Sequence, residues 1–408
     1  MPKAAMSRRD VLRRAGIGAA TLVVGSAARR VLGANDRIGL ASIGCGGRGT
    51  ALMGEARKHA EELNVDFVAV CDVYRPTRER AVARIKDWTG REPRAFSRFA
   101  DLLALDEVDA VIIATPDFAH SPILAAAATA GKDAYCEKPM ATNMADGKAA
   151  VKAVEEGERV VQIGTQRRSS GSYRGVADLI QSGVLGKITK VDCCYHDHGP
   201  RWERSSAGIK PEDVDWEQYL MGLPKRPFDP RRFRCWHLYK DYTNGTPGLL
   251  GSHAIDAAVW FMDDPLPTSG VAHGGVYVWK NREHADTIDC LLEYPKGWLL
   301  NYSTRLGNSF CLANYVIYGT AGTFDMKSMT ARGEGGGSDK LQEDVRPQAR
   351  PSEDHMKNWL ECIRSRNTPN APVRAGYAHS VAAIIADLSW QTGRRYVYDA
   401  EREELRPG

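Results

Sequence analysis

Hydrophobic and polar residues follow two different periods along this chain, and the change comes near Gln166. Before that residue, short continuous apolar runs are separated by segments with helical spacing. Continuous apolar runs are typical of parallel strands buried on both faces, so this half predicts a doubly wound α/β domain. The predicted strands are 38–43, 65–71, 95–96, 110–114, 133–136 and 160–163. The predicted helices are 50–63, 76–88, 99–105, 121–130 and 143–156.

After Gln166 the apolar residues recur with period two, which predicts strands with one buried and one solvated face. A helix over 173–182 is followed by predicted strands at 188–195, 270–279, 287–294, 298–304 and 314–319. We therefore expect an α+β domain with a large, open, mostly antiparallel sheet. Residues 333–348 predict a Gly-rich surface loop, and helices over 354–364 and 376–393 are expected to pack back on the body.

A long segment without regular periodicity, 197–246, interrupts the second half. It is rich in Trp, Tyr, Arg and Pro, and irregular segments of this length inside a compact domain are usually functional. These changes of pattern divide the chain into four parts. The predicted boundaries are 1–34, 35–166 for a nucleotide-binding domain, 167–345 for a substrate and oligomerisation domain, and 346–408 for a C-terminal helical segment.

A glycine-rich turn follows the first predicted strand, where the chain reads IGLASIGCGGRG from Ile38 to Gly49. Gly44, Gly46 and Gly49 have the spacing G-x-G-x-x-G, which suits a tight strand-to-helix turn that holds a pyrophosphate at a helix N-terminus. Such a glycine string alone also fits an ordinary loop. Here Asp72 ends the next apolar run, 23 residues after Gly49, where a ribose ligand is expected. The predicted dinucleotide contacts are Gly44, Cys45, Gly46, Gly47, Arg48, Gly49 and Asp72.

Charge is concentrated at the beginning of the chain. The 408 residues have a formal net charge of +4, but residues 1–34 hold seven basic and one acidic side chain, which leaves a net charge of −2 for the rest. A nearly neutral body lacks the basic surface that binds nucleic acid, so no nucleic-acid partner is expected. A hydrophobic content of 43% is that of a globular protein with full cores.

The basic beginning has the pattern of a twin-arginine export signal. Arg8 and Arg9 precede an uncharged, Gly/Ala-rich run from Ala15 to Ala28, which is too short to remain as a membrane anchor. We therefore expect export in a folded state, to the periplasm or outside the cell, with a tightly held cofactor. A basic amphipathic start of a cytoplasmic protein is the alternative.

The cysteines and histidines give no metal-binding spacing. Nine cysteines include no C-x-x-C pair, and most are expected to be buried free thiols. A disulfide through Cys193 or Cys194 is compatible with an oxidising compartment, but its partner is not determined by sequence. His196 and His198 lie on one strand face without a third ligand at suitable spacing, so no metal site is predicted.

Two residues are candidates for the chemistry. Lys138 ends an apolar strand at the expected ligand edge of the sheet, where an amine can assist the removal of a hydroxyl proton. His253 begins an apolar helix and can act as an acid or base, with Asp256 one turn away. A surface lysine and a buried structural histidine are the corresponding structural alternatives.

Aromatic residues of the irregular segment suggest a sugar-binding surface, because aromatic faces pack against the C–H groups of pyranose rings; local packing is the alternative. They are Trp202, Trp236, His237 and Tyr239. The predicted substrate contacts are Tyr195, Trp236, His237 and Asp256.

Several motifs occur together in one order. They are the glycine turn, Asp72, VDAVIIATPDFAH over 108–120, EKPM over 137–140, GTQ over 164–166 and GSHAIDAAVWF over 251–261. In this combination the chain resembles the glucose-fructose oxidoreductase / inositol dehydrogenase / MocA family over nearly all of its length after residue 35. The resemblance implies a Rossmann domain followed by an α/β domain, and action on sugars, polyols or their derivatives with NAD or NADP.

The resemblance also implies roles for individual residues. Lys138 and His253 correspond to the family's catalytic lysine and histidine. The implied cofactor contacts are Thr115, Pro116, His120, Glu137 and Gln166. One position departs from the family pattern, since Leu249 stands where the family often has an Asp. Asp72 favours NAD because its carboxylate repels a 2′-phosphate, although Arg75 nearby leaves NADP open.

Three functions remain open at this point. The first is an exported sugar or polyol oxidoreductase with tightly held NAD, acting on a small carbohydrate and forming a homo-oligomer. The second is a glycoside-cleaving hydrolase or lyase that oxidises its sugar transiently and regenerates NAD in each cycle. The third is a non-catalytic sugar- or nucleotide-binding protein, for which only Leu249 argues.

Overall fold

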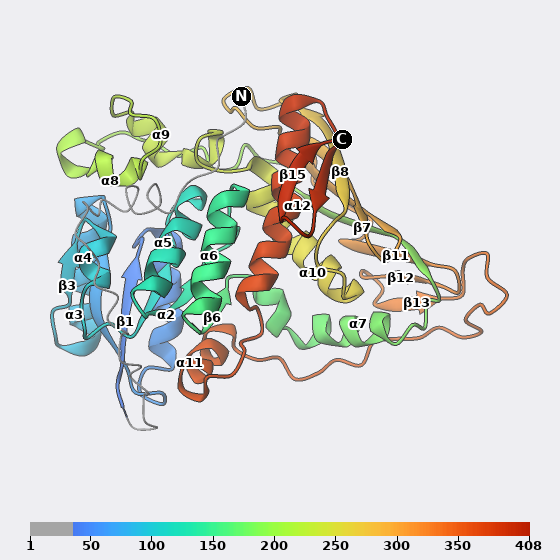
Figure 1. The fold of residues 1–408 in the computed structure, drawn as a ribbon, viewed down its shortest axis with the longest axis horizontal. Helices are drawn as coiled ribbons and strands as arrows, with labels where there is room; N and C mark the ends of the chain where they lie inside the picture. The colour runs from blue at the N-terminus through green and yellow to red at the C-terminus, as the bar shows by residue number, and fades with distance from the viewer. Residues whose placement is uncertain (1–35) are drawn as a thin grey trace.

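The computed structural model describes residues 36–408, so the predicted export signal lies outside the described residues. Two sheets lie side by side, the smaller built from the first third of the described chain and the larger from the remainder (Figure 1). Long helices fill the space between them. The predicted combination of a doubly wound parallel sheet with a second, mostly antiparallel one is confirmed.

Within residues 36–408, the first sheet has six parallel strands in the order β3-β2-β1-β4-β5-β6. The strands are β1 (Ile38–Ile43), β2 (Val65–Cys71), β3 (Arg94–Phe96), β4 (Ala110–Ile113), β5 (Asp133–Cys136) and β6 (Val161–Ile163). The helices between them are α2 (Gly47–Lys58), α3 (Arg75–Thr89), α4 (Phe99–Leu103), α5 (Asp117–Thr129) and α6 (Met144–Glu156). The strand order reverses between β1 and β4, and this position is where such sheets bind ligands.

The first sheet is buried on both faces, as its continuous apolar strands predict. Side chains of β1 alternate between two cores, with Ile38 and Leu40 on one side and Ala41 and Ile43 on the other. Every residue of β1, β4 and β5 is buried. The carboxyl ends of these strands therefore meet at one edge, which is where the glycine turn and Lys138 lie.

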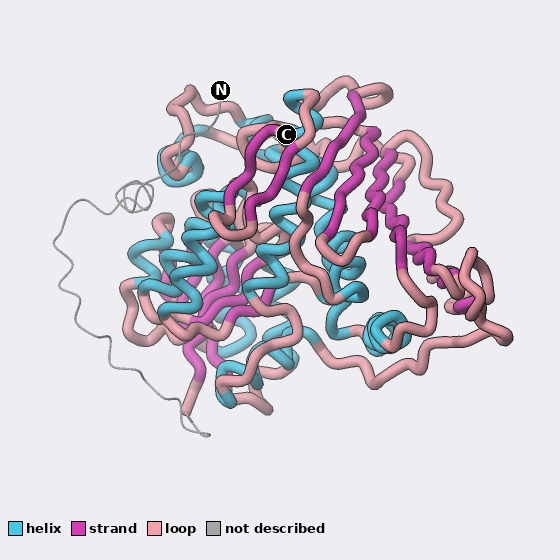
Figure 2. Tube along the Cα trace, turned by 45° about the vertical axis from the view of Figure 1, so that its right-hand side comes forward, coloured by secondary structure: helices cyan, strands magenta, loops and turns pink. Residues whose placement is uncertain are grey.

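The second sheet has nine strands in the described part of the chain, ordered β13-β12-β11-β7-β10-β9-β8-β14-β15. Its strands are β7 (Ile188–His196), β8 (Ser269–Gly275), β9 (Thr287–Tyr294), β10 (Trp298–Arg305), β11 (Tyr315–Gly319), β12 (Thr323–Asp325), β13 (Thr330–Arg332), β14 (Tyr396–Asp399) and β15 (Glu404–Pro407). All neighbours are antiparallel except β7 and β10. Side chains of β9 and β10 alternate between buried and accessible positions, so one face of the sheet is covered by helices (Figure 2).

The helices of the second half connect the two sheets. They are α7 (Gly171–Gln181), α8 (Trp216–Leu220), α9 (Pro230–Arg234), α10 (Ser252–Met262), α11 (His355–Ser365) and α12 (Val373–Thr392). Helix α11 packs Met356 and Trp359 against the first sheet, whereas α12 runs between the sheets and contacts β8 as well as α6. Short 3-10 turns occupy Gln166–Ser169, Pro211–Asp213 and Trp236–Leu238, and Pro247–Gly251 is a π-helical turn before α10.

Three sequence expectations need correction. The strand expected over 270–279 ends at Gly275, because the chain turns away and the backbone of 277–279 is held by the Asp286 carboxylate. The C-terminal segment is not only helical, since β14 and β15 extend the large sheet. The irregular segment contains α8 and α9, which lie over the ligand edge of the first sheet (Figure 1).

Among residues 36–408, no helix has the length and apolarity needed to cross a membrane.

Candidate functional site

The glycine turn between β1 and α2 has the geometry that its spacing predicts. Gly44 has a φ of +86°, and a Cβ there would lie 2.6 Å from the carbonyl oxygen of Ala114. A Cβ on Gly49 would lie 1.9 Å from the Gly44 carbonyl oxygen, so only glycine permits this approach of helix to strand. These two positions are therefore restricted by the protein's own backbone.

The protein itself does not restrict Gly46 and Gly47, because a Cβ on either would meet no protein atom within 4 Å. They line the cleft, and Gly46 caps α2 without a side-chain hydrogen bond to the first turn. Helix N-terminal N–H groups that face an open cleft are suited to a pyrophosphate. Empty space at these glycines thus fits a dinucleotide.

Asp72 directly follows β2 and lies next to the glycine turn. Its carboxylate accepts the backbone N–H groups of Cys45 and Tyr74, both at 2.8 Å. Burial raises the pKa of Asp72, and these two N–H groups oppose the shift. Arg75 turns away to pair with Asp213 and Glu79, so it is not positioned to offset the charge of Asp72.

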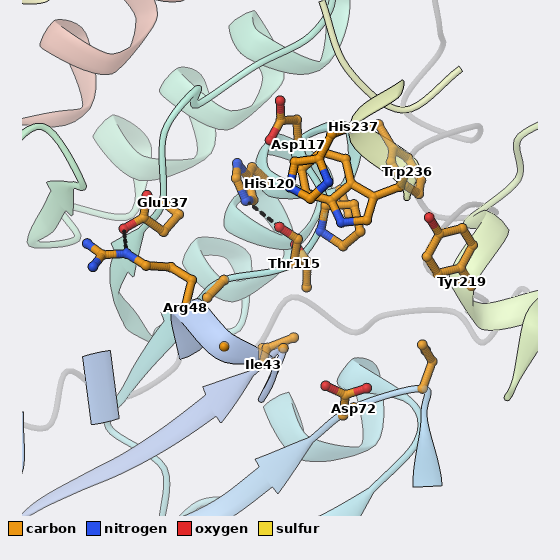
Figure 3. Close-up of a pocket in the computed structure, with 18 of the residues that line it drawn as sticks. Ile43, Arg48, Asp72, Thr115, Asp117, His120, Glu137, Tyr219, Trp236 and His237 are labelled. Atoms are coloured by element: carbon orange, nitrogen blue, oxygen red, sulfur yellow. Dashed lines mark hydrogen bonds and ion pairs between the residues drawn. The ribbon is translucent and has the colours of Figure 1, made fainter. Parts of the chain in front are cut away.

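His120 joins two loops at the same edge. Its Nε2 lies 2.9 Å from the Thr115 carbonyl oxygen (Figure 3). Its Nδ1 lies 2.7 Å from the Pro139 carbonyl oxygen. Burial lowers the pKa of this imidazole. Because both ring nitrogens already face carbonyl oxygens, His120 holds the loop after β4, with Thr115 and Pro116, against the loop after β5.

Glu137 and Gln166 occupy the next positions along the edge. Glu137 is buried, and its carboxylate accepts hydrogen bonds from Arg48 Nε at 2.6 Å and from its neighbour's backbone N–H at 3.1 Å (Figure 3). Gln166 donates from Nε2 to the Tyr135 hydroxyl at 2.9 Å. The Arg48–Glu137 pair connects the start of α2 to the loop that carries the candidate lysine.

Lys138 points across the cleft toward the second domain, where its Nζ donates to the carbonyl oxygen of Leu249 at 2.6 Å. Burial lowers the pKa of this amine, and the nearby Glu137 and Asp117 carboxyl groups oppose the shift. The π-helical turn that contains Leu249 offers a main-chain acceptor in the place where the resemblance leads us to expect a carboxylate. One N–H of the amine is thus used by Leu249, and the rest of the Nζ atom remains for a ligand.

Asp117 is a residue of the site that sequence reasoning did not select. It begins α5, is 3% exposed, and accepts a hydrogen bond from the Thr243 hydroxyl at 2.7 Å. Burial raises its pKa to about 7, while Lys138 and the Thr243 hydroxyl oppose the shift. The available signal was its position directly after Thr115 and Pro116, at the end of β4.

His253 lies in the first turn of α10 and faces the cleft. Burial and the nearby Lys138 ammonium lower its pKa well below the usual value. Its Nδ1 is buried and has no hydrogen-bond partner among residues 36–408. A neutral imidazole with an unpartnered nitrogen is available to accept or donate a proton.

Asp256 was predicted to contact the substrate, but its side chain does not line the cleft. Its side chain is fully buried and accepts two hydrogen bonds from Arg168 Nε, at 2.9 and 3.1 Å. Burial would raise its pKa, but Arg168 and His379 lower it to about 2. Asp256 therefore stabilises the interior beside α10, and a direct substrate contact does not fit this position.

The predicted substrate end of the cleft is lined by aromatic rings, as Figure 3 shows for Trp236 and His237. The His237 ring is stacked on Trp236 with centroids 3.6 Å apart, and Trp202 stacks at 5.6 Å from the same imidazole. Tyr195 lies beside them with the Arg201 guanidinium over its ring. Tyr239, by contrast, binds Arg231 outside the cleft.

Most of these groups surround one cleft of about 750 Å³, which suits a ligand larger than a single sugar. Of the residues predicted from sequence, Cys45, Gly49 and Asp256 do not line it. The predicted residues that do are Gly44, Gly46, Gly47, Arg48, Asp72, Thr115, Pro116, His120, Glu137, Lys138, Gln166, Tyr195, Trp236, His237 and His253. Cys45 and Gly49 instead shape the turn that forms its floor.

His196 and His198, the two histidines considered as metal ligands, lie in different surroundings. His198 is exposed next to Asp197, whereas His196 lies near Cys194 and Cys311 on the accessible face of the large sheet. Within the described residues these three form the one group with ligand atoms inside 4.8 Å of one another.

Comparison with known proteins identifies the class of this fold and site. Residues 38–165 match the oxidoreductase family with an NAD-binding Rossmann fold, and residues 173–325 match the C-terminal domain of the same family. These domains define an oxidoreductase that binds NAD, which confirms the predicted cofactor. The chain belongs to the glucose-fructose oxidoreductase / inositol dehydrogenase / MocA family.

Individual relatives are distant. Inositol 2-dehydrogenase of Salmonella paratyphi B is 34% identical over 143 residues, which is 35% of this chain and 40% of that protein. Inositol 2-dehydrogenase of Streptomyces avermitilis is 25% identical over 374 residues, covering 88% of this chain and 96% of that one. Among solved structures, the WlbA dehydrogenase of Bordetella pertussis, in complex with NADH and UDP-GlcNAcA, superposes with a TM-score of 0.64 at 22% identity, over 89% of this chain and 99% of that chain.

Proposed function

We propose that this protein is an NAD-dependent dehydrogenase that oxidises a hydroxyl group of a sugar, a polyol or a sugar derivative. The observation that carries the proposal is the position of Lys138 and His253, which face the same cleft as the glycine turn. Two distant segments thereby bring proton-transferring side chains to the site of the nicotinamide cofactor. The inositol 2-dehydrogenase relatives support a polyol or sugar as substrate.

NAD, when bound, accepts a hydride from the carbon that carries the substrate hydroxyl. The residues that would hold it are those of the glycine turn, with Asp72 toward the ribose and Glu137 and Gln166 nearer the reacting end. Lys138 would hydrogen-bond the hydroxyl oxygen and, with its lowered pKa, accept the hydroxyl proton. Its bond to the Leu249 carbonyl orients the amine.

His253 would act as the second proton-transfer group. Because burial keeps its imidazole neutral, it can receive a proton or donate a hydrogen bond without carrying a charge into the cleft. Its backbone is fixed by Arg167, whose guanidinium donates to the His253 carbonyl oxygen at 3.2 Å. The stacked Trp202, His237 and Trp236 rings would bind the apolar face of a sugar ring.

A second candidate function, redox-neutral cleavage of a glycoside, is favoured by one observation. His237 is a second neutral imidazole in the cleft, and its Nδ1 has no partner among residues 36–408. Elimination of a leaving group next to a transient carbonyl needs one base and one acid, and two imidazoles provide them.

One assay separates the two candidates. Purified protein is loaded with NAD and offered inositols, aldoses, uronic acids and aryl glycosides, while the reduced nicotinamide absorbance and released aglycone are both followed. Net accumulation of reduced cofactor supports the dehydrogenase. Release of aglycone without net reduction supports the glycosidase. Neither reduced cofactor nor released aglycone with any compound contradicts both.

We also propose that residues 1–34 direct folded, NAD-loaded protein through the twin-arginine pathway to the periplasm or beyond. The paired arginines and uncharged run support this. Replacement of Arg8 and Arg9 by lysine should stop export, as measured by cell fractionation. We further propose that the protein forms a homo-oligomer. Light scattering of the purified protein measures its mass and tests this.

A further inference from the structure

The accessible face of the large sheet carries a pair of cysteines that the proposed chemistry does not use. Cys194 belongs to β7, and Cys311 belongs to the loop between β10 and β11. Their Sγ atoms lie 2.7 Å apart although they are 117 positions apart in the chain. Both thiols point at the Ala313 carbonyl oxygen, Cys311 at 3.0 Å and Cys194 at 3.5 Å. The fold itself therefore brings these two sulfur atoms together.

The backbone around the pair is held in register. Cys194 donates its N–H to the Asn314 carbonyl oxygen at 3.2 Å, which continues the antiparallel pairing of β7 with β11. The adjacent Cys193 is buried and belongs to the opposite core. Period-two alternation thus separates the two neighbouring cysteines onto opposite faces of the sheet.

The loop that carries Cys311 has few other attachments. Phe310 is 67% exposed and Leu312 is 73% exposed, so neither contributes much apolar burial. The Arg305 guanidinium donates to the Phe310 carbonyl oxygen at 2.6 Å, and the Phe310 N–H donates to Asn308. A segment with so little buried surface opens easily unless it is tied covalently.

The beginning of the same loop belongs to the substrate end of the cleft. Leu306 is fully buried and packs with Leu249 and Leu250, both of which line the cleft. The Trp279 indole N–H donates to the Leu306 carbonyl oxygen at 2.9 Å. The cysteine pair therefore lies at the outer end of a loop whose inner end forms part of the cleft wall.

A metal ion explains this arrangement less well. His196 is the third group within reach, but its Nδ1 accepts the Arg305 N–H at 3.1 Å, and no fourth ligand joins the group within residues 36–408. Two thiolates bound to one tetrahedral zinc at ~2.3 Å would be held about 3.7 Å apart, which exceeds the observed separation. The nearby Arg305 charge also opposes a cation.

We propose that Cys194 and Cys311 form a disulfide that fastens the 306–314 loop to β7 and so stabilises the outer wall of the cleft. The oxidant is a low-molecular-weight or protein disulfide. The Cys311 thiolate attacks one sulfur of that disulfide and releases one thiolate. Cys194, after losing its proton to solvent, attacks the mixed disulfide and releases the second. Two thiols lose two protons and two electrons, and the oxidant disulfide is reduced to two thiols.

The experiment uses the purified full chain, reduced, freed of reductant and then equilibrated with glutathione disulfide. Trypsin should release peptide 191–201 joined to peptide 306–327, and reduction should separate them. Under denaturing conditions, seven of the nine thiols should remain titratable. The joined peptide should be absent from Cys311→Ser and Cys194→Ser, and present in the matched control Cys193→Ser.

A second readout reports the effect on the loop. Chymotrypsin should cleave after the exposed Phe310 about five-fold more slowly in the oxidised protein than in the reduced one, and this difference should vanish in Cys311→Ser. Nine titratable thiols after complete glutathione oxidation would overturn the proposal. So would a reduced protein that retains zinc through Cys194 and Cys311 and resists oxidation. NAD affinity, unchanged by either variant, controls for folding.

Discussion

The two ends of the cleft are built in different ways. At the nucleotide end, the glycine turn, Asp72 and Glu137 each follow directly after a parallel strand, and the two carboxylates already have hydrogen-bond partners within the protein. At the substrate end, the rings come from the end of β7, from the irregular segment and from α10, and the Nδ1 atoms of His237 and His253 have no partner within residues 36–408. At the nucleotide end a ligand thus meets backbone N–H groups and already paired carboxylates, and at the predicted substrate end it meets side-chain nitrogens that still lack a hydrogen-bond partner.

Lys138 stands where the two ends meet, and its removal should have the largest effect. Lys138→Ala should lower kcat about 10³-fold, because the hydroxyl loses its proton acceptor, while NAD affinity stays within a factor of about two. Steady-state kinetics and cofactor titration measure both. Lys152→Ala, an exposed lysine paired with Glu156, is the matched control and should leave kcat unchanged. Wild-type turnover in Lys138→Ala would remove the proposed role.

The next effect concerns the interior that supports His253. Arg168→Met should lower the free energy of unfolding by about 3 kcal/mol, because the buried Asp256 carboxylate loses its partner. The matched control Arg350→Met removes an exposed pair with Asp178 and should change it by less than about 1 kcal/mol. Denaturant unfolding at neutral pH measures both, and equal effects would contradict the burial argument.

The Arg168–Asp256 ion pair also makes the free energy of unfolding depend on pH. The Asp256 pKa of about 2, against an ordinary 3.8, contributes stability that is fully present above about pH 4 and is lost as the pH falls toward 2. The contribution is about 2 kcal/mol. Acid unfolding of wild type should show this loss, and Arg168→Met should show a smaller loss over the same interval, as followed by circular dichroism.

Gly46, the N-cap of α2, and Gly54 within α2 provide a matched test of the nucleotide end. A Cβ meets no atom within 4 Å at Gly46 or at Gly54, yet only Gly46 lines the cleft. Gly46→Ala should therefore weaken NAD binding about 30-fold by occupying pyrophosphate space. Gly54→Ala should leave binding unchanged and raise stability by up to about 1 kcal/mol, because alanine favours helix. Equal NAD dissociation constants for the two variants would place the pyrophosphate elsewhere.

The smallest expected effect tests the substrate end. Trp236→Ala removes one ring of the stack on His237 and should raise KM about tenfold, with a change in kcat of less than about threefold. NAD affinity of the same variant serves as its control. A tenfold loss of NAD affinity instead would show that the aromatic wall belongs to the nucleotide end, and the contrast between the two ends would fail.

The sequence predicted the nucleotide end in detail because the requirements there are local. Gly44 needs a positive φ and Gly49 must approach Gly44 closely, and both demands appear as fixed spacing after one apolar run. Asp117 was missed because the hydrogen bond that its carboxylate accepts comes from Thr243, 126 positions away in the chain. Asp256 was misplaced because helical spacing from His253 does not show that Arg168 covers its carboxylate.

By itself, the sequence determined the two kinds of sheet and the glycine turn of an NAD-binding domain, because strand periodicity and glycine spacing are properties of neighbouring residues. Only the tertiary structure decided which side chains share the cleft, that a backbone carbonyl of Leu249 receives the Lys138 amine, and that Cys194 meets Cys311 rather than another cysteine. These pairings join residues more than a hundred positions apart. Their geometry depends on how the two sheets pack, which no local pattern encodes.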